Sequence, residues 1–262
     1  MLKNVAWLRR VTHQKINKFI SSSSLFSISS CSSQKVKDIL TFPLTHNHET
    51  PPTIETTKKL PSVTRILSAT KPPEQQLILL NWKKKMIAEM GEEGFNQMQK
   101  DTLSAGSACH SSIEEYLKGT PLDKICPKEN STQLWKSVRP VLADVGAVGN
   151  TEFKVVHSHL GYSGYLDCNA VYKGTMCVID WKTSKKRRYR IQDCYDDPVQ
   201  VVAYAGALNH SSASSNQITH GLVVKIYHDG QTASVFCMNE FMMDYYWQKW
   251  LQRLSQFHKM NK

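Results

Sequence analysis

The sequence has no apolar run close to the roughly 18 residues of a membrane-spanning helix, and its stretch QQLILLNW is much shorter. It has no Cys-x-x-Cys pair, and its seven cysteines are scattered and odd in number. It also shows no internal repeat. These absences argue against membrane insertion, a zinc ribbon and a disulfide framework, so we expect free thiols in a reducing compartment.

Acidic residues are absent from positions 1–37, which contain seven of the 33 lysines and arginines. Of the net charge of +11, these seven leave about +4 for the rest of the chain. The same segment is rich in serine and lacks the unbroken apolar stretch of a secretory signal. This composition is typical of a mitochondrial transit peptide and predicts a location in the mitochondrial matrix. An ordinary disordered basic tail is the alternative.

The region after this leader predicts a linker and then a helical part. Residues 38–60 contain prolines and threonines with little periodicity, which is typical of a linker. Residues 61–150 are expected to be helical, beginning with a short helix that Ser62 caps. Three further helices are expected, at about residues 74–90, 95–118 and 131–145.

The spacing of apolar residues changes in residues 151–262, and the pattern there predicts a mixed α/β core. The run from TEFKVV to WKTS predicts a β-meander with a tight turn at Lys173 and Gly174. A helix is expected to begin at Asp197, directly before a proline. Two strands around the Asp-Gly turn signal in YHDGQT follow, and the tail predicts a final amphipathic helix.

The stretch GYLDCNAVYKGTMCVIDWKTS has acids where a buried strand would have aliphatic residues. If Lys173 and Gly174 form the turn, Asp167 lies opposite Asp180, and Lys182 lies on the same face as Asp180. Two facing carboxylates repel unless a cation lies between them, so the spacing favours a hard divalent ion such as Mg²⁺. The alternative is a pair of exposed edge charges, and a slip of one residue would separate the two aspartates.

Four short motifs occur in a specific order, G-x-x-x-H, G-x-x-D, D-x-K-T and Q-x-x-x-Y. Their defining residues are Gly106 and His110, Gly164 and Asp167, Asp180 and Lys182, and Gln200 and Tyr204. Over roughly residues 60–258 the sequence resembles the RecB-like branch of the PD-(D/E)XK nuclease superfamily, and within it the mitochondrial exonucleases.

The resemblance implies the fold and the metal chemistry. The fold would be α/β, a restriction-endonuclease-like core whose mixed central sheet is flanked by helices, with a helical N-terminal extension. One or two Mg²⁺ or Mn²⁺ ions would be held by His110, Asp167, Asp180 and the backbone carbonyl of Trp181. Lys182 would orient or deprotonate the attacking water. An iron–sulfur cluster needs four suitably spaced cysteines, and none is expected because only Cys237 follows Cys194.

The resemblance also implies supporting residues around this centre. Gln200 and Tyr204, one helical turn apart, would position the phosphate or support the metal shell. Glu152 would add a carboxylate outside that shell. Glu114 would pair with the lysine or the histidine of the motifs.

Two basic segments with aromatic neighbours favour contact with a nucleic-acid backbone. The candidate DNA-binding residues are Lys185, Lys186, Arg187 and Arg188, together with Trp82 and Lys84 in NWKKKM. Solvated charged loops without a partner are the alternative explanation.

The function that the resemblance implies is a metal-dependent single-stranded DNA exonuclease. It would process ends and flaps in mitochondrial DNA replication and maintenance, with the mitochondrial replication machinery as partner. A non-catalytic nucleic-acid-binding protein on the same fold and a structure-specific endonuclease are the alternatives. The presence of Asp167, Asp180 and Lys182 together argues against the first of these.

Overall fold

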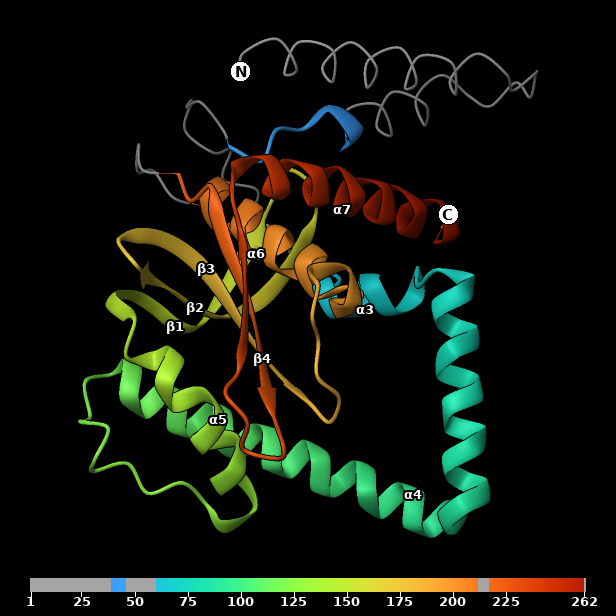
Figure 1. The fold of residues 1–262 in the computed structure, drawn as a ribbon. Helices are drawn as coiled ribbons and strands as arrows, with labels where there is room; N and C mark the ends of the chain where they lie inside the picture. The colour runs from blue at the N-terminus through green and yellow to red at the C-terminus, as the bar shows by residue number, and fades with distance from the viewer. Residues whose placement is uncertain (1–38, 46–59, 212–216, 262) are drawn as a thin grey trace, which may run out of the picture. The chain divides into compact units, whose positions relative to one another are not determined.

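The computed structural model describes residues 39–45, 60–211 and 217–261, so the predicted transit peptide and most of the predicted linker lie outside it. Its five strands form one mixed sheet in the order β1-β2-β3-β4-β5 (Figure 1). The strands are β1 (Val145–His157), β2 (Tyr162–Tyr172), β3 (Thr175–Ser184), β4 (His220–Tyr227) and β5 (Ser234–Met238). Only β3 and β4 are parallel among these neighbours. The predicted α/β class is confirmed.

The helices lie close to their predicted positions. They are α3 (Val63–Ala69), α4 (Pro73–Leu117), α5 (Thr132–Leu142), α6 (Asp197–Ser211) and α7 (Glu240–Met260), with short 3-10 turns at Glu129–Ser131 and Ile191–Cys194. Ser62 caps α3, because its side chain accepts a hydrogen bond from the backbone N–H of Arg65. Among the described residues, no helix is long and apolar enough to cross a bilayer.

The two helices expected within residues 74–118 form one element that turns sharply, as Figure 1 shows for α4. Its backbone is non-helical at Gly91, where φ is 76° and ψ is 169°. A glycine tolerates this conformation at little cost, so Gly91 separates an exposed first half from a second half that packs on the core.

Different helices cover the two faces of β3 and β4. Val178 and Val223 belong to a buried cluster with residues of α3, α6 and α7, including Trp247. Ile179 and Val224 belong to a second cluster with residues of α4 and α5. Because strand side chains alternate, the even-numbered residues of β3 face α6 and the odd-numbered ones face α4 and α5.

The hairpin of β2 and β3 has the predicted register. Lys173 and Gly174 have φ of 48° and 86°, and positive φ at both central residues is the signature of a two-residue hairpin turn. Five residue pairs follow from that turn, from Tyr172 with Thr175 to Cys168 with Ile179. The crossover through α6 then returns the chain to β4, beside β3.

Candidate active site

The site lies where β2 and β3 separate. Their pairing ends at Cys168 and Ile179, whereas on their outer edges β3 stays paired with β4 and β2 with β1 beyond this point. At this point Oδ2 of Asp167 accepts a hydrogen bond of 2.8 Å from the backbone N–H of Trp181. The Asp167 side chain thus accepts this hydrogen bond in place of a backbone carbonyl, and the bond holds the Asp167 carboxylate against β3.

Three carboxylates form a row across β1, β2 and β3. The β1–β2 pairs on either side place Glu152 beside Asp167, and the β2–β3 register continued by one residue places Asp167 opposite Asp180. Glu152 has a φ of 45°, which is unfavourable for a residue other than glycine. Such strain is found preferentially at functional sites.

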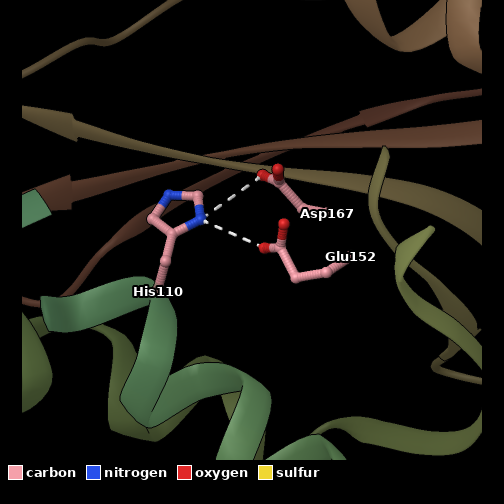
Figure 2. Close-up of side chains that lie close together, drawn as sticks. All are labelled: His110, Glu152 and Asp167. Carbon is pink, nitrogen blue, oxygen red and sulfur yellow. Dashed lines mark ion pairs between the residues drawn. The ribbon is translucent and has the colours of Figure 1, made fainter. Parts of the chain in front are cut away.

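His110, on the second half of α4, covers one end of this row. Its Nε2 lies 2.9 Å from the carbonyl oxygen of Trp181. A carbonyl can only accept a hydrogen bond, so Nε2 holds a proton. Nδ1 lies 3.9 Å from Oε1 of Glu152 and 4.0 Å from Oδ2 of Asp167, as Figure 2 shows. Nδ1 of His110 therefore faces two carboxylates, an arrangement that a cation between them would stabilise.

His110, Glu152 and Asp167 could hold a metal ion together. One ligand atom from each lies within 4.8 Å of the other two. Burial raises the pKa of Glu152, and the neighbouring carboxylate of Asp167 raises it further against the opposing effect of His110. The ring nitrogen and the two carboxylates are a donor set suited to a divalent cation.

Asp180 lies outside that group of three, beside Lys182. It is only 1% exposed, and its Oδ1 accepts a hydrogen bond of 2.7 Å from the Lys182 ammonium. Its Oδ2 is buried and has no hydrogen-bond partner among the described residues. Burial raises the pKa of Asp180 to about 7, Asp167 adds to this, and Lys182 opposes it. Burial alone would lower the pKa of Lys182, but the neighbouring carboxylates outweigh burial and raise it, so Lys182 is protonated.

Two of the motifs depend on each other sterically. A Cβ atom added at Gly164 would lie 2.5 Å from Cε1 of Tyr204, so G-x-x-D leaves the space that Q-x-x-x-Y fills. Gln200 donates a hydrogen bond of 2.7 Å to the Tyr204 hydroxyl. Burial and then the charge of Asp180 raise the pKa of Tyr204 well above its usual range, so Tyr204 keeps its proton.

The remaining candidate residues lie around this centre. Glu114 was expected to pair with Lys182 or His110, but its carboxylate pairs with Lys118 at 2.6 Å, one turn further along α4. A pocket of about 520 Å³ lies beside the second half of α4, and Lys185 and His228 from the segments after β3 and β4 line it. Lys186 is exposed.

The two arginines of the basic run stack on aromatic rings. Arg187 lies over Tyr227, with its guanidinium 5.6 Å from the ring centre, and it also contacts the side chain of Gln231. Arg188 lies over Tyr195 at 5.3 Å.

Trp82 and Lys84 lie on the exposed first half of α4, before the break at Gly91. Trp82 makes an edge-to-face contact with Phe95, across that break. The aromatic ring is 40% exposed and so leaves a surface open to a partner.

One charged residue near the site was not singled out from the sequence. Lys225 of β4 is only 8% exposed, and its ammonium forms an ion pair with the carboxylate of Asp197 at the start of α6. The signal was a single lysine within the apolar strand GLVVKIY, comparable to the single aspartate within CVIDW. A charge in a buried strand needs a partner, and here the partner comes from a distant helix.

No protein-family model matches the chain. Mitochondrial genome maintenance exonuclease 1 of Mus musculus is 41% identical over 205 residues, which are 78% of this chain and 60% of that protein. The Xenopus tropicalis protein of the same name is 42% identical over 200 residues, 76% of this chain and 58% of that protein. The Homo sapiens protein is 41% identical over 208 residues, 78% of this chain and 59% of that protein. This chain is a homologue of mitochondrial genome maintenance exonuclease 1.

The homology to mitochondrial genome maintenance exonuclease 1 confirms the resemblance to the mitochondrial exonucleases. The chain spans about three fifths of the length of these curated relatives. Among solved structures, the crystal structure of SSO0001 has a TM-score of 0.39 and 16% identity over 89% of this chain and 87% of that one, a likeness too low to support an argument.

Proposed function

We propose that this protein is a metal-dependent exonuclease that hydrolyses phosphodiester bonds of single-stranded DNA in mitochondria. The observation that supports this most is the row of Glu152, Asp167 and Asp180 at the split between β2 and β3, with His110 and Lys182 beside it. The printed name of the relatives supports an exonuclease and a mitochondrial location. Action on ends and flaps in the matrix, with the replication machinery as partner, is part of the same proposal.

The residues present fit a divalent cation. The buried Oδ2 of Asp180 has no partner among the described residues, and Nδ1 of His110 faces two carboxylates. We therefore propose Asp167, Asp180, His110 and the carbonyl of Trp181 as ligands, and add Glu152 as a direct ligand. Oxygen ligands suit Mg²⁺, and a set that includes imidazole also suits Mn²⁺. When bound, such an ion polarises the phosphate and lowers the pKa of a bound water.

The protonation states give the protein residues their proposed roles. The raised pKa of Lys182 keeps a positive charge beside Asp180, so Lys182 stabilises the developing charge on the phosphate and orients the attacking water. The Tyr204 hydroxyl, also protonated, donates a hydrogen bond toward the site or the phosphate, and Gln200 holds it in place.

Basic and aromatic residues support single-stranded DNA as the substrate. The exposed ammonium groups attract phosphates, and exposed rings such as Trp82 can stack on bases. The proposed DNA-binding residues are Lys185, Lys186, Arg187 and Arg188 after β3, with Trp82 and Lys84 on α4. The pocket of about 520 Å³ that Lys185 lines lies beside the second half of α4 and offers room for a nucleotide.

The test is digestion of linear and circular single-stranded DNA by the wild type and Lys182→Ala, with Mg²⁺ or with EDTA. We expect linear DNA to be degraded only with Mg²⁺, and K182A to be slower by about 10²–10³-fold, the usual loss for one charge-stabilising group. Lys259→Ala, an exposed lysine near the end of α7, is the control and should keep wild-type activity.

The alternatives predict other results in the same assay. DNA binding without Mg²⁺-dependent cleavage would contradict the enzyme and favour a binding protein. Efficient cutting of circular DNA would contradict the exonuclease and favour an endonuclease. Circular dichroism of K182A verifies that a lost activity does not reflect a lost fold.

A further inference from the structure

Two lysines lie side by side on the face of the sheet that α6 covers. Lys182 of β3 and Lys225 of β4 are direct partners in the parallel register. Partners in adjacent strands point to the same face, and like charges placed this way destabilise a sheet. Both side chains are withdrawn from water, Lys225 almost completely and Lys182 in large part. Each ammonium therefore needs a carboxylate of its own.

The two carboxylates come from different elements. Lys182 forms an ion pair at 2.7 Å with Asp180, two residues earlier on its own strand. Lys225 forms an ion pair with Asp197, the first residue of α6. The charge of Asp197 also reaches Asp180 and Lys182, so the two ion pairs lie near one another.

Removing the charge of Asp197 would leave Lys225 as a buried ammonium without its acid. On the neighbouring strand, the Asp180 carboxylate has one buried oxygen that has no hydrogen-bond partner among the described residues. Burial of an unpaired charge is costly, so the Lys225 ammonium would turn to that oxygen. Asp180 would then be bound by two lysines and be less available to a metal ion.

We propose that Asp197 and Lys225 form a positioning pair that keeps the Asp180 carboxylate available to the catalytic metal. The inference rests on the proposed metal-dependent function. Neither residue touches the substrate or the ion in this scheme, and both act through Asp180. Asp197 neutralises Lys225 where it lies, which leaves Lys182 as the single cation bound to Asp180.

Asp196, the residue before Asp197, provides a matched control. Its carboxylate pairs with Arg253 of α7 at 3.0 Å. Arg253 also donates to Thr70 and to the backbone of Leu67, at the end of α3. This neighbouring ion pair has comparable burial but joins helices rather than facing the site.

The experiment measures Mn²⁺ binding by titration calorimetry to the full chain without DNA, and separately kcat and KM for cleavage with saturating Mn²⁺. For Asp197→Asn we expect Mn²⁺ affinity to fall about 10–100-fold, the usual loss when a residue that orients a metal ligand is removed. The KM for DNA should stay unchanged. The double variant D197N/K225M should recover affinity to within about threefold of wild type, because the competing ammonium is gone, and Asp197→Glu should recover it too.

Four results decide the inference. The inference is wrong if D197N binds Mn²⁺ as tightly as wild type, or if D197N/K225M binds it as weakly as D197N. It is also wrong if Asp196→Asn loses as much Mn²⁺ affinity as D197N. If D197N does not fold, the test uses Lys225→Met alone. We expect its Mn²⁺ affinity to lie within threefold of wild type, and a tenfold loss would contradict the proposal. Failure of the proposed function appears separately, as a wild type that binds Mn²⁺ but does not cleave DNA.

Discussion

The acids of the candidate site and the acids at the start of α6 differ in how their charge is balanced. Asp196 and Asp197 each have one basic partner, Arg253 and Lys225. Glu152, Asp167 and Asp180 share only one histidine and one lysine among the described residues. Each of the two aspartates near α6 is thus balanced by a cation of its own, whereas three carboxylates across the sheet share one lysine. The difference separates acids whose charge is balanced within the protein from acids arranged for a ligand.

The comparison predicts its largest effect on stability at Arg253. Arg253→Met leaves Asp196 unpaired and removes the hydrogen bonds to Thr70 and Leu67. Breaking a largely buried pair from one side lowers the free energy of unfolding by about 3–5 kcal/mol, which urea denaturation measures. Lys249→Met, at an exposed site on the same helix, should change it by less than about 1 kcal/mol. A loss of DNA cleavage per folded molecule in R253M would remove the distinction between the two groups of acids.

A smaller effect is expected at the contact between two motifs. Gly164→Ala brings a methyl group to 2.5 Å from the Tyr204 ring and 3.3 Å from Val63, so overpacking should cost about 1–3 kcal/mol of unfolding free energy and shift Tyr204. At Gly106, the other motif glycine, an added methyl group meets only Thr183, at 3.8 Å. Thermal unfolding should therefore show that Gly106→Ala is at least as stable as wild type, because alanine favours a helix more than glycine does. Equal losses in the two variants would contradict the steric link.

The smallest effect concerns the charge of Asp180 in protein without metal. Its pKa is about 7 in the folded chain, against an ordinary value of 3.8. Between these values the folded state holds a proton that the unfolded state has lost, so stability falls as the pH rises from about 4 to 7 and is level above that. Asp180→Asn cannot ionise and should therefore unfold at a higher temperature than wild type at pH 8 in EDTA, with no gain at pH 4. Asp123→Asn, on an exposed turn, should show no such difference.

Much of the fold could be predicted because its signals are local. The turn at Lys173 and Gly174 fixes the β2–β3 register through the backbone of two residues, and the register then places Asp167 near Asp180. Ser62 and Asp197 begin their helices as their positions indicate. Strand alternation and the position of one turn were enough to predict that Asp167 lies opposite Asp180.

The rest depends on contacts between distant segments. Glu152 was expected outside the metal shell, and its place beside Asp167 follows from the β1–β2 register, which two irregularities near Val148 shift. The pair of Lys225 and Asp197 forms only when α6 returns the chain to β4. The spacing of residues in the sequence does not predict this ion pair, because the pair depends on how α6 packs on the sheet.

The hairpin turn at Lys173 and Gly174 also affects the order of folding. Strands joined by two residues pair within about 1–10 μs, whereas the parallel pair of β3 and β4 has to wait for the crossover through α6 to close. We therefore expect Asp167 and Asp180 to meet early, before His110 and Lys225 arrive from distant segments. Their repulsion then raises the free-energy barrier to folding. Because salt screens this repulsion, we expect the folding rate to rise with ionic strength.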